Sequence, residues 1–200
     1  LLKGNEVKYQ KESGVLLHIS SLPSAYGIGS LGREAYRFVD FLKSSRQTYW
    51  QLLPLCPVGR GNSPYSSVSS FAGELLFIDL EQLVNLGLLR PEDIVPPDFP
   101  KHTDYKAARA FKLPLIKKAA ENFNIKSRDF KTFCRENAYW LDDYAVFMAI
   151  KEARRSKSFT ELEDGLKYRL PAAMEQFKNK HSEQILFYKI TQYFFFSQYL

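Results

Sequence analysis

Cysteine is scarce in this sequence: the 200 residues contain two, Cys56 and Cys134. They lie far apart and have no neighbours at the spacing of zinc ligands. The sequence therefore provides neither a disulfide framework nor a thiolate metal site. Isolated cysteines are typical of free thiols in a reducing compartment, so we expect a cytoplasmic protein.

Long hydrophobic runs are also missing. The most apolar stretch, near the C-terminus, is interrupted by Lys189, Gln192 and Gln198 and falls short of the roughly 20 apolar residues that cross a bilayer. Residues 1–12 are charged and lack the apolar core of a secretory signal. We therefore expect no membrane partner and no secretory leader.

Charge of one sign is in modest excess, with 28 Lys and Arg against 22 Asp and Glu and a net charge of +6. The basic residues are scattered among acidic ones, and no RNA- or DNA-binding motif accompanies them. This distribution indicates a solvated basic surface and excludes nucleic acid as the expected partner.

The apolar pattern near the start of the chain predicts a strand, a helix and a second strand. Residues 14–19 and 50–55 are short, nearly unbroken apolar runs, typical of strands buried in a parallel sheet. Between them, apolar residues recur at helical spacing over 33–45. This order predicts a right-handed parallel crossover.

The remaining chain is predicted to be mainly helical. Residues 75–80 form an apolar run that we interpret as a strand or an extended segment. Helical patterns then cover 105–122, 127–155, 171–178 and 182–199.

A polar, aromatic loop rich in Gly and Pro follows the second strand, as is typical of a binding-site wall. It contains Ser63-Pro64-Tyr65, one of several blocks in a fixed order. The others are Ser-Gly-Val-Leu-Leu-His at 13–18, Ser-Leu-Pro-Ser-Ala-Tyr-Gly-Ile-Gly at 21–29, Tyr-Trp-Gln-Leu-Leu-Pro-Leu at 49–55, Phe-Ala-Gly at 71–73 and Trp-Leu-Asp-Asp-Tyr-Ala at 140–145. In these blocks the chain resembles the 4-α-glucanotransferases called amylomaltases or disproportionating enzymes, glycoside hydrolase family 77.

The resemblance implies an α/β fold: the N-terminal part of a (β/α)8 barrel, with about two barrel strands and a mainly helical inserted subdomain. We expect the barrel to begin over 1–57, a loop-rich excursion lining the cleft over 58–100, the helical insertion over 101–182, and a helix returning to the barrel over 183–200. A complete barrel needs about 250 residues, more than this chain has. The apolar C-terminal run also predicts that the polypeptide continues beyond Leu200.

The resemblance further implies transfer of α-1,4-glucan segments between maltodextrins by a retaining double displacement, in maltodextrin or glycogen metabolism. The partner is then an α-1,4-glucan, and no metal or organic cofactor is implied. The catalytic carboxylates are expected beyond Leu200, so this chain alone should be inactive.

Three residues are candidates for substrate binding. In the resembled family the Tyr of Ser-Pro-Tyr lies against the sugar near the scissile bond, a role that carries over to Tyr65. An aromatic ring suits the apolar face of a pyranose, while nearby polar groups bond its hydroxyls. Ser63 is a candidate polar contact, although Ser before Pro is also an ordinary turn residue. His18 ends the first strand, where a structural role competes with substrate contact.

The chain departs from the family pattern at several positions. Arg60 stands where many members have an aromatic residue of an accessory glucan site, Ser66 replaces a common Gln, and Glu74-Leu75 replaces Asn-Pro. These changes put the accessory site in question. Asp142 and Asp143 are tempting as an acid and base pair, but neighbours on a helix point about 100° apart and do not face one another. We expect them to be solvated.

An alternative from another class is a stand-alone, non-catalytic module that binds glucan or a helical partner. The C-terminal run distinguishes the two, because a free module would expose Phe194 to Phe196 as an apolar patch and aggregate.

Overall fold

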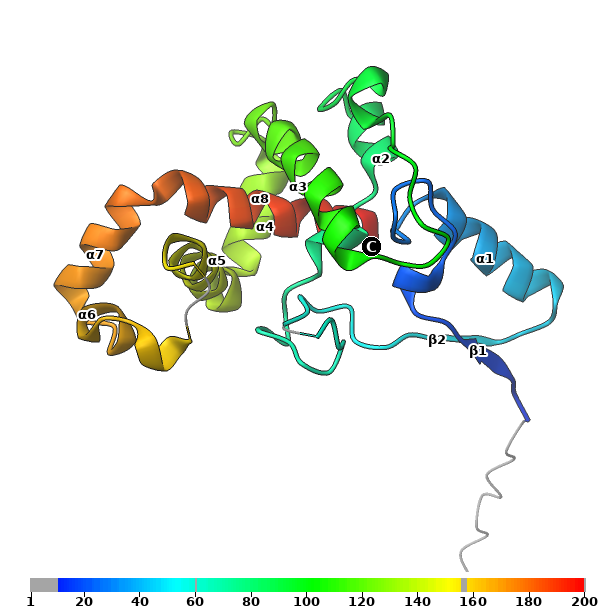
Figure 1. The fold of residues 1–200 in the computed structure, drawn as a ribbon, viewed down its shortest axis with the longest axis horizontal. Helices are drawn as coiled ribbons and strands as arrows, with labels where there is room; N and C mark the ends of the chain where they lie inside the picture. Colours follow the sequence, from blue (N-terminus) through cyan, green and yellow to red (C-terminus); the bar gives the residue numbers. More distant parts are fainter. Residues whose placement is uncertain (1–10, 60, 156–157, 200) are drawn as a thin grey trace, which may run out of the picture.

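One small parallel sheet and a larger set of helices make up the computed structural model (Figure 1). It describes residues 11–59, 61–155 and 158–199. Arg60, where the sequence raised the question of an accessory glucan site, lies outside the described residues.

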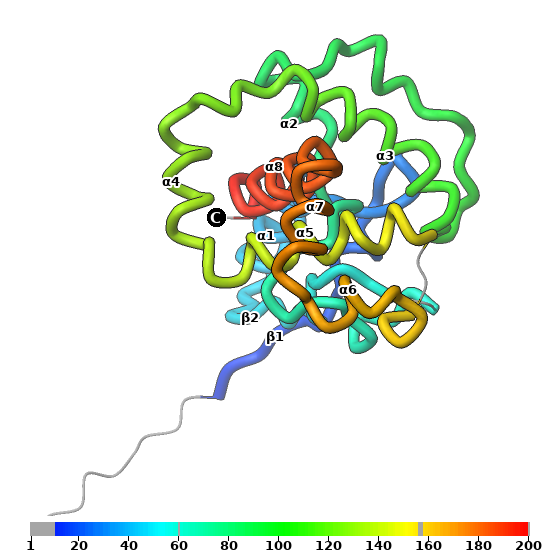
Figure 2. Tube along the Cα trace, turned by 90° about the vertical axis from the view of Figure 1, so that its left-hand side faces the viewer, coloured from blue at the N-terminus to red at the C-terminus, as the bar shows by residue number. Residues whose placement is uncertain are grey.

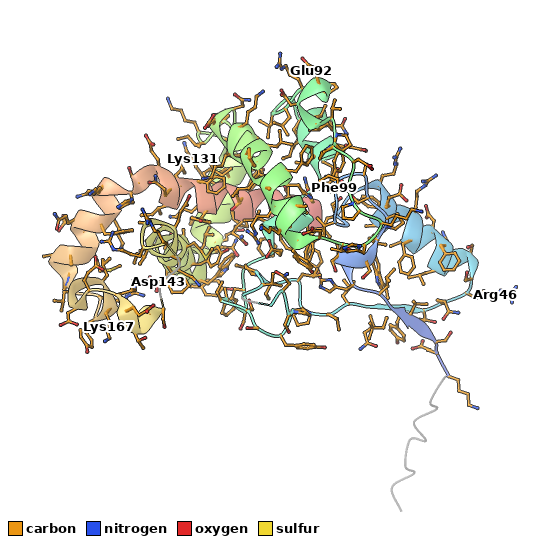
Figure 3. The ribbon with its side chains drawn as sticks, viewed as in Figure 1. Arg46, Glu92, Phe99, Lys131, Asp143 and Lys167 are labelled. Carbon is orange, nitrogen blue, oxygen red and sulfur yellow. The ribbon has the colours of Figure 1, made fainter. Side chains whose placement is uncertain are left out.

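The sheet consists of β1 (Gly14–Leu16) and β2 (Tyr49–Gln51), which pair in parallel with Gly14 opposite Tyr49. They are joined by α1 (Arg33–Ser44), so the predicted strand, helix and strand order is confirmed. Gly14 is needed for this pairing, because a Cβ there would lie 2.5 Å from the carbonyl oxygen of Tyr49. Arg46 makes the turn from α1 to β2 in the left-handed region (φ 55°), at the outer end of the molecule (Figure 3).

The strands are shorter and more exposed than predicted. After Leu16 the chain leaves the sheet and forms a 3-10 turn, η1 (Ile19–Ser21), capped by the His18 side chain. Leu16 is 54% and Tyr49 57% exposed, because no further strand covers them within the described residues.

The helices after β2 begin with short elements: η2 (Leu75–Phe77), α2 (Leu80–Asn85) and η3 (Pro91–Ile94). The longer helices are α3 (Tyr105–Glu121), α4 (Arg128–Glu136) and α5 (Ala138–Ala153). The last group is η4 (Phe159–Glu161), α6 (Asp164–Lys167), α7 (Pro171–Lys180) and α8 (Ser182–Tyr199). The prediction of 182–199 as a helix is confirmed to the residue.

The prediction of a strand or extended segment over 75–80 is wrong. The Glu74 side chain accepts the backbone N–H of Leu76 and begins η2, and the Asp79 side chain accepts that of Gln82 and begins α2. Both are N-caps, which satisfy donors that a helix start leaves free. The apolar run is therefore buried as two helical turns.

The helical pattern predicted over 127–155 is found as two helices, α4 and α5, which Asn137 divides. Asn137 ends α4 and precedes α5, with its side-chain amide donating to the carbonyl of Phe133 at 2.9 Å. Its carbonyl oxygen accepts the indole N–H of Trp140 at 3.1 Å. An Asn side chain competes with the helical backbone in this way and favours a break.

The core is organised around α8, which lies among the other helices when viewed along its length (Figure 2). Phe194 is 1% and Phe195 3% exposed, in the same buried cluster as η2 and α3. The expectation that Phe194 to Phe196 form an exposed patch in this chain is therefore wrong. The helices packed on α8 cover the two rings, and Phe196 is partly buried.

Candidate functional site

The carboxyl ends of β1 and β2 lie at one edge of the sheet because the strands are parallel. In barrel enzymes this edge carries the site. His18 follows β1 and is 7% exposed. Its Nδ1 lies 2.8 Å from Ser20 Oγ, and its Nε2 lies 3.3 Å from the carbonyl oxygen of Pro54, beyond β2. The ring therefore joins the segments that follow the two strands.

Burial lowers the pKa of His18, and its hydrogen bond with the Pro54 carbonyl opposes that shift. The ring also packs edge-on against Phe77, with centroids 5.3 Å apart. Both ring nitrogens of His18 have protein partners, which favours a structural role over substrate contact. Contact between His18 and substrate stays a prediction.

The loop after β2 forms a short hairpin. Val58 and Ser67 form an antiparallel bridge, and the N–H of Gly59 donates to the carbonyl of Ser66 at 2.8 Å. Gly61 (φ 85°) and Asn62 (φ 54°) make the turn in the left-handed region. Glycine and asparagine adopt this region readily, so the local sequence dictates the hairpin.

Ser63 and Tyr65 lie at the tip of this hairpin. The Ser63 hydroxyl accepts the backbone N–H of Tyr65 at 3.3 Å, and the Ser63 carbonyl accepts the N–H of Ser66 at 3.0 Å. The Tyr65 side chain is left out of the core, with 75% of the residue exposed. The tip thus presents a free aromatic ring beside a hydroxyl.

The base of the hairpin adjoins a pocket of about 440 Å³. Its walls come from residues 52–56 after β2, from residues 71–73, and from Phe195, Phe196 and Tyr199 of α8. The pocket is mainly apolar and lies at the carboxyl end of β2. It joins the strand end to the last turns of α8.

One residue of this region escaped the sequence reasoning. Glu74 was noted only as a departure from the family pattern, yet its carboxylate is 1% exposed and bonds to both ends of the loop. The signal lay in the substitution itself, an acid inside an apolar run. Its ion-pair partner, Arg109, could not be read from local sequence.

The acidic residues singled out by sequence are engaged elsewhere. Asp142 pairs with Lys189 and Asp143 with Arg169, and both carboxylates are more than half exposed. Asp143 lies on the side of α5 that is nearer to α6 (Figure 3). Asp79 accepts hydrogen bonds from the hydroxyl of Ser30 and the backbone N–H of Gln82, which is a structural role.

No group of three or more His, Cys, Asp or Glu that could hold a metal occurs among the described residues. Across the same residues, no helix is long and apolar enough to span a membrane. Cys56 and Cys134 are free, as predicted.

Three features define the class of protein. They are a parallel unit of strand, helix and strand, the large helical segment that follows it, and the hairpin with an aromatic residue at the strand ends. The chain is the N-terminal part of a (β/α)8-barrel enzyme fold with a mainly helical inserted subdomain.

Within that class, the model of the 4-alpha-glucanotransferase family matches residues 17–200, and the chain belongs to this family. It is 43% identical to a 4-alpha-glucanotransferase of Streptococcus pneumoniae over 199 residues, covering 96% of this chain and 39% of that protein. A 4-alpha-glucanotransferase of Thermus thermophilus is 42% identical over 191 residues, covering 92% of this chain and 38% of that protein.

Two solved structures share this fold. The amylomaltase from Streptococcus agalactiae in complex with acarbose superposes with a TM-score of 0.89 at 38% identity, over 95% of this chain and 40% of that one. An amylomaltase from Corynebacterium glutamicum, 17% identical over 94% of this chain and 27% of that one, shares the fold with a TM-score of 0.67. The chain thus spans about two fifths of the length of the curated relatives just named.

Proposed function

We propose that the protein containing this chain is a 4-α-glucanotransferase that transfers α-1,4-glucan segments between maltodextrins with retention of configuration. The observation that carries the proposal is family membership over residues 17–200, in a chain whose strand ends present the hairpin with Ser63 and Tyr65. The Streptococcus agalactiae amylomaltase, solved in complex with acarbose, supports it.

In this proposal Tyr65 contacts the sugar. Its exposed ring offers a flat apolar surface to the C–H face of a pyranose, and its hydroxyl can bond a sugar hydroxyl. Ser63, at the same tip, supplies a second polar contact. In this proposal His18 mainly holds the segments after the two strands together, through its bonds to Ser20 and Pro54. A contact between His18 and the sugar is its secondary role.

The proposed chemistry is a double displacement. A carboxylate attacks C1 of the donor sugar while a carboxylic acid gives its proton to the leaving O4, which forms a covalent glycosyl-enzyme. The same second residue then takes the proton of an acceptor 4-OH, whose oxygen attacks C1 and releases the first carboxylate. We assign these groups to the part of the protein outside this chain, because the relatives are more than twice as long.

Further parts of the proposal concern setting and organisation. Free Cys56 and Cys134 favour a reducing cytoplasm, where maltodextrin or glycogen would be the substrate pool. The division into a barrel start over 1–57, a cleft-lining excursion over 58–100, a helical insertion over 101–182 and a returning helix over 183–200 is also proposed.

The experiment is a maltotriose assay on the complete protein, with glucose and longer maltodextrins separated by chromatography. We expect both products from the wild type and none from the 200-residue chain alone. Glucose and maltose without longer products would mean hydrolysis and contradict the proposal.

Two substitutions test the site. Tyr65→Ala should lower kcat/KM by about tenfold, the loss expected when one aromatic contact is removed, whereas Tyr65→Phe should keep most of it. Tyr168, an equally solvent-facing tyrosine on the distant end of α6, provides the control Tyr168→Ala, which should behave as wild type.

A further inference from the structure

Glu74 is a buried carboxylate at the base of the hairpin that carries Tyr65. It is 1% exposed, and three N–H groups donate to it. The backbone of Val58 donates to Oε2 at 3.0 Å, while the backbone of Leu76 and the guanidinium of Arg109 donate to Oε1 at 3.1 and 3.3 Å. A buried charge is tolerated when it is paired in this way.

These bonds close the loop at its base. Val58 begins the hairpin and Leu76 lies beyond its end, in η2, so one carboxylate holds both. The backbone N–H of Glu74 also donates to the carbonyl of Leu55 at 2.8 Å. The segments entering and leaving the loop are thereby fixed relative to one another.

The hairpin itself has little pairing beyond this base. Among the described residues, its two arms are connected close to the base by the Val58–Ser67 bridge and the bond between Gly59 and Ser66. The backbone N–H of Val68 and the hydroxyl of Ser67 also donate to the carbonyl of Pro57, at 3.4 and 2.9 Å. An isolated two-stranded hairpin is marginally stable in water. The direction in which the tip with Tyr65 points therefore depends on how the base is held.

Arg109 connects this base to the helical part of the chain. It lies on α3, 35 residues after Glu74, with 42% of its side chain exposed. Lys112, three positions on and so on the same face of α3, donates to the carbonyl of Leu76. Two cations of α3 thus hold the segment from Glu74 to Leu76. Separating Arg109 from the buried Glu74 carboxylate would leave that charge without a partner, which is strongly unfavourable. We therefore expect the pair to hold this segment rigidly.

We propose that Glu74, held by Arg109, is the positioning residue that keeps the Ser63 and Tyr65 hairpin in its sugar-contacting orientation. The inference rests on the proposed function for its catalytic consequence, although the clamp itself does not. It concerns a position where this chain departs from the family pattern, so it describes a property of this protein.

Hydrogen exchange on the complete protein tests the clamp without substrate. In Glu74→Gln an amide N–H replaces one accepting oxygen, so a backbone donor loses its partner. We expect amide exchange over 58–66 to accelerate about tenfold, the loss of a buried hydrogen bond, with α5 unchanged. Equal exchange in the wild type and the variant would overturn the proposal.

A double-mutant cycle tests the consequence for catalysis. Glu74→Gln should lower kcat/KM for maltotriose about tenfold in the wild type but less than about twofold in Tyr65→Ala, because the two act through one contact. The same factor in both backgrounds would overturn a role through Tyr65. A loss of overall stability alone would act equally in both.

Two further variants keep the test decisive. Arg109→Gln disturbs a half-exposed group, so it should fold even if Glu74→Gln does not, and we expect a smaller effect in the same direction on exchange and on the cycle. Asp143→Asn removes the exposed ion pair with Arg169 and should show neither effect. A wild type inactive on maltotriose would refute the proposed function and with it the catalytic role. The exchange result decides the clamp in either case.

Discussion

The most informative perturbation for stability is Lys112→Met, because Lys112 is a wholly buried amine. It is 0% exposed on α3, and its ammonium donates to the carbonyl of Leu76. Burial lowers the pKa of Lys112 to about 8, against the opposing influence of the Asp79 and Glu74 carboxylates. Methionine is unbranched and one atom shorter than lysine, so it fills most of the same space and removes the charge.

The sign and size of the change in the free energy of unfolding follow from the proton that Lys112 binds. The pKa of Lys112 falls from 10.5 in the unfolded chain to about 8 in the fold, and the difference corresponds to about 3 kcal/mol at 1.36 kcal/mol per unit. Below pH 8 the fold bears this whole cost. Between pH 8 and 10.5 the unfolded chain binds more protons, so the free energy of unfolding rises with pH.

Tyrosines limit the useful range. Burial raises the pKa of Tyr144 and of Tyr188, and that of Tyr26 to about 12. Because unfolded tyrosines ionise near pH 10, these residues lower stability above that value. Burial also raises the pKa of Cys56 and of Cys134, whose unfolded thiols ionise within this range. The difference between the wild type and Lys112→Met from pH 7 to 9.5 therefore isolates Lys112, because the other groups are common to both proteins.

The assay is urea unfolding followed by tryptophan fluorescence, on the wild type and on Lys112→Met. From pH 7 to 9.5 the wild type should gain about 2 kcal/mol relative to the variant. Lys106→Met, on the exposed side of the same helix, is the control and should give a flat difference. Parallel pH curves for wild type and Lys112→Met would refute the reasoning.

Three other substitutions have defined outcomes. Gln192→Leu leaves the buried N–H and carbonyl of Gly73 without their partner and should cost about 3 kcal/mol in urea unfolding, against about 0.5 kcal/mol or less for exposed Gln184→Leu. Leu141→Ala, at a residue 0% exposed, should lower stability by about 3 kcal/mol and reduce Tm; an unchanged Tm would contradict its place in the core. Asp143→Asn should change unfolding by less than about 1 kcal/mol, and a larger loss would mean that its pair with Arg169 is more than a surface contact.

Regular periodic elements could be predicted from the sequence. The helix over 33–45 and the helix over 105–122 are found at Arg33–Ser44 and Tyr105–Glu121. The parallel pair of strands is also found, in a shorter form. In each case the apolar spacing along the chain indicates the type of element, although the two strands also need one another as partners.

Elements whose start is set by a side-chain cap were harder to predict from the sequence. The run over 75–80 is apolar enough for a strand, but Glu74 and Asp79 turn it into two helical starts. A signal existed, since Asp79 followed by Gln82 is the pattern of a helix N-terminus. The division at Asn137 was similarly marked by a residue that favours caps over helix interiors.

The site divides in the same way. The segment with Tyr65 could be recognised as a loop because its Gly, Pro and Ser content is local, but its hairpin pairing could not. The buried carboxylate that holds it could not, because its partner lies on α3 and its burial results from packing of segments far apart in sequence. Sequence patterns locate the loop that we propose as a contact surface, while the residues that orient it are brought together by the tertiary structure.

Long-range contacts also connect the segment of Glu74 to α8. The amide of Gln192 bonds both the N–H and the carbonyl of Gly73, and the amide of Gln198 does the same for Asp79. Gln192 and Gln198 are separated by as many residues as Gly73 and Asp79. Each glutamine amide therefore both donates to and accepts from one backbone position of the segment. Because Arg109 on α3 bonds Glu74, this segment is held by two helices, α3 and α8. The helical region therefore sets where the hairpin base lies, and changes in its packing should reach Tyr65 without touching the sugar.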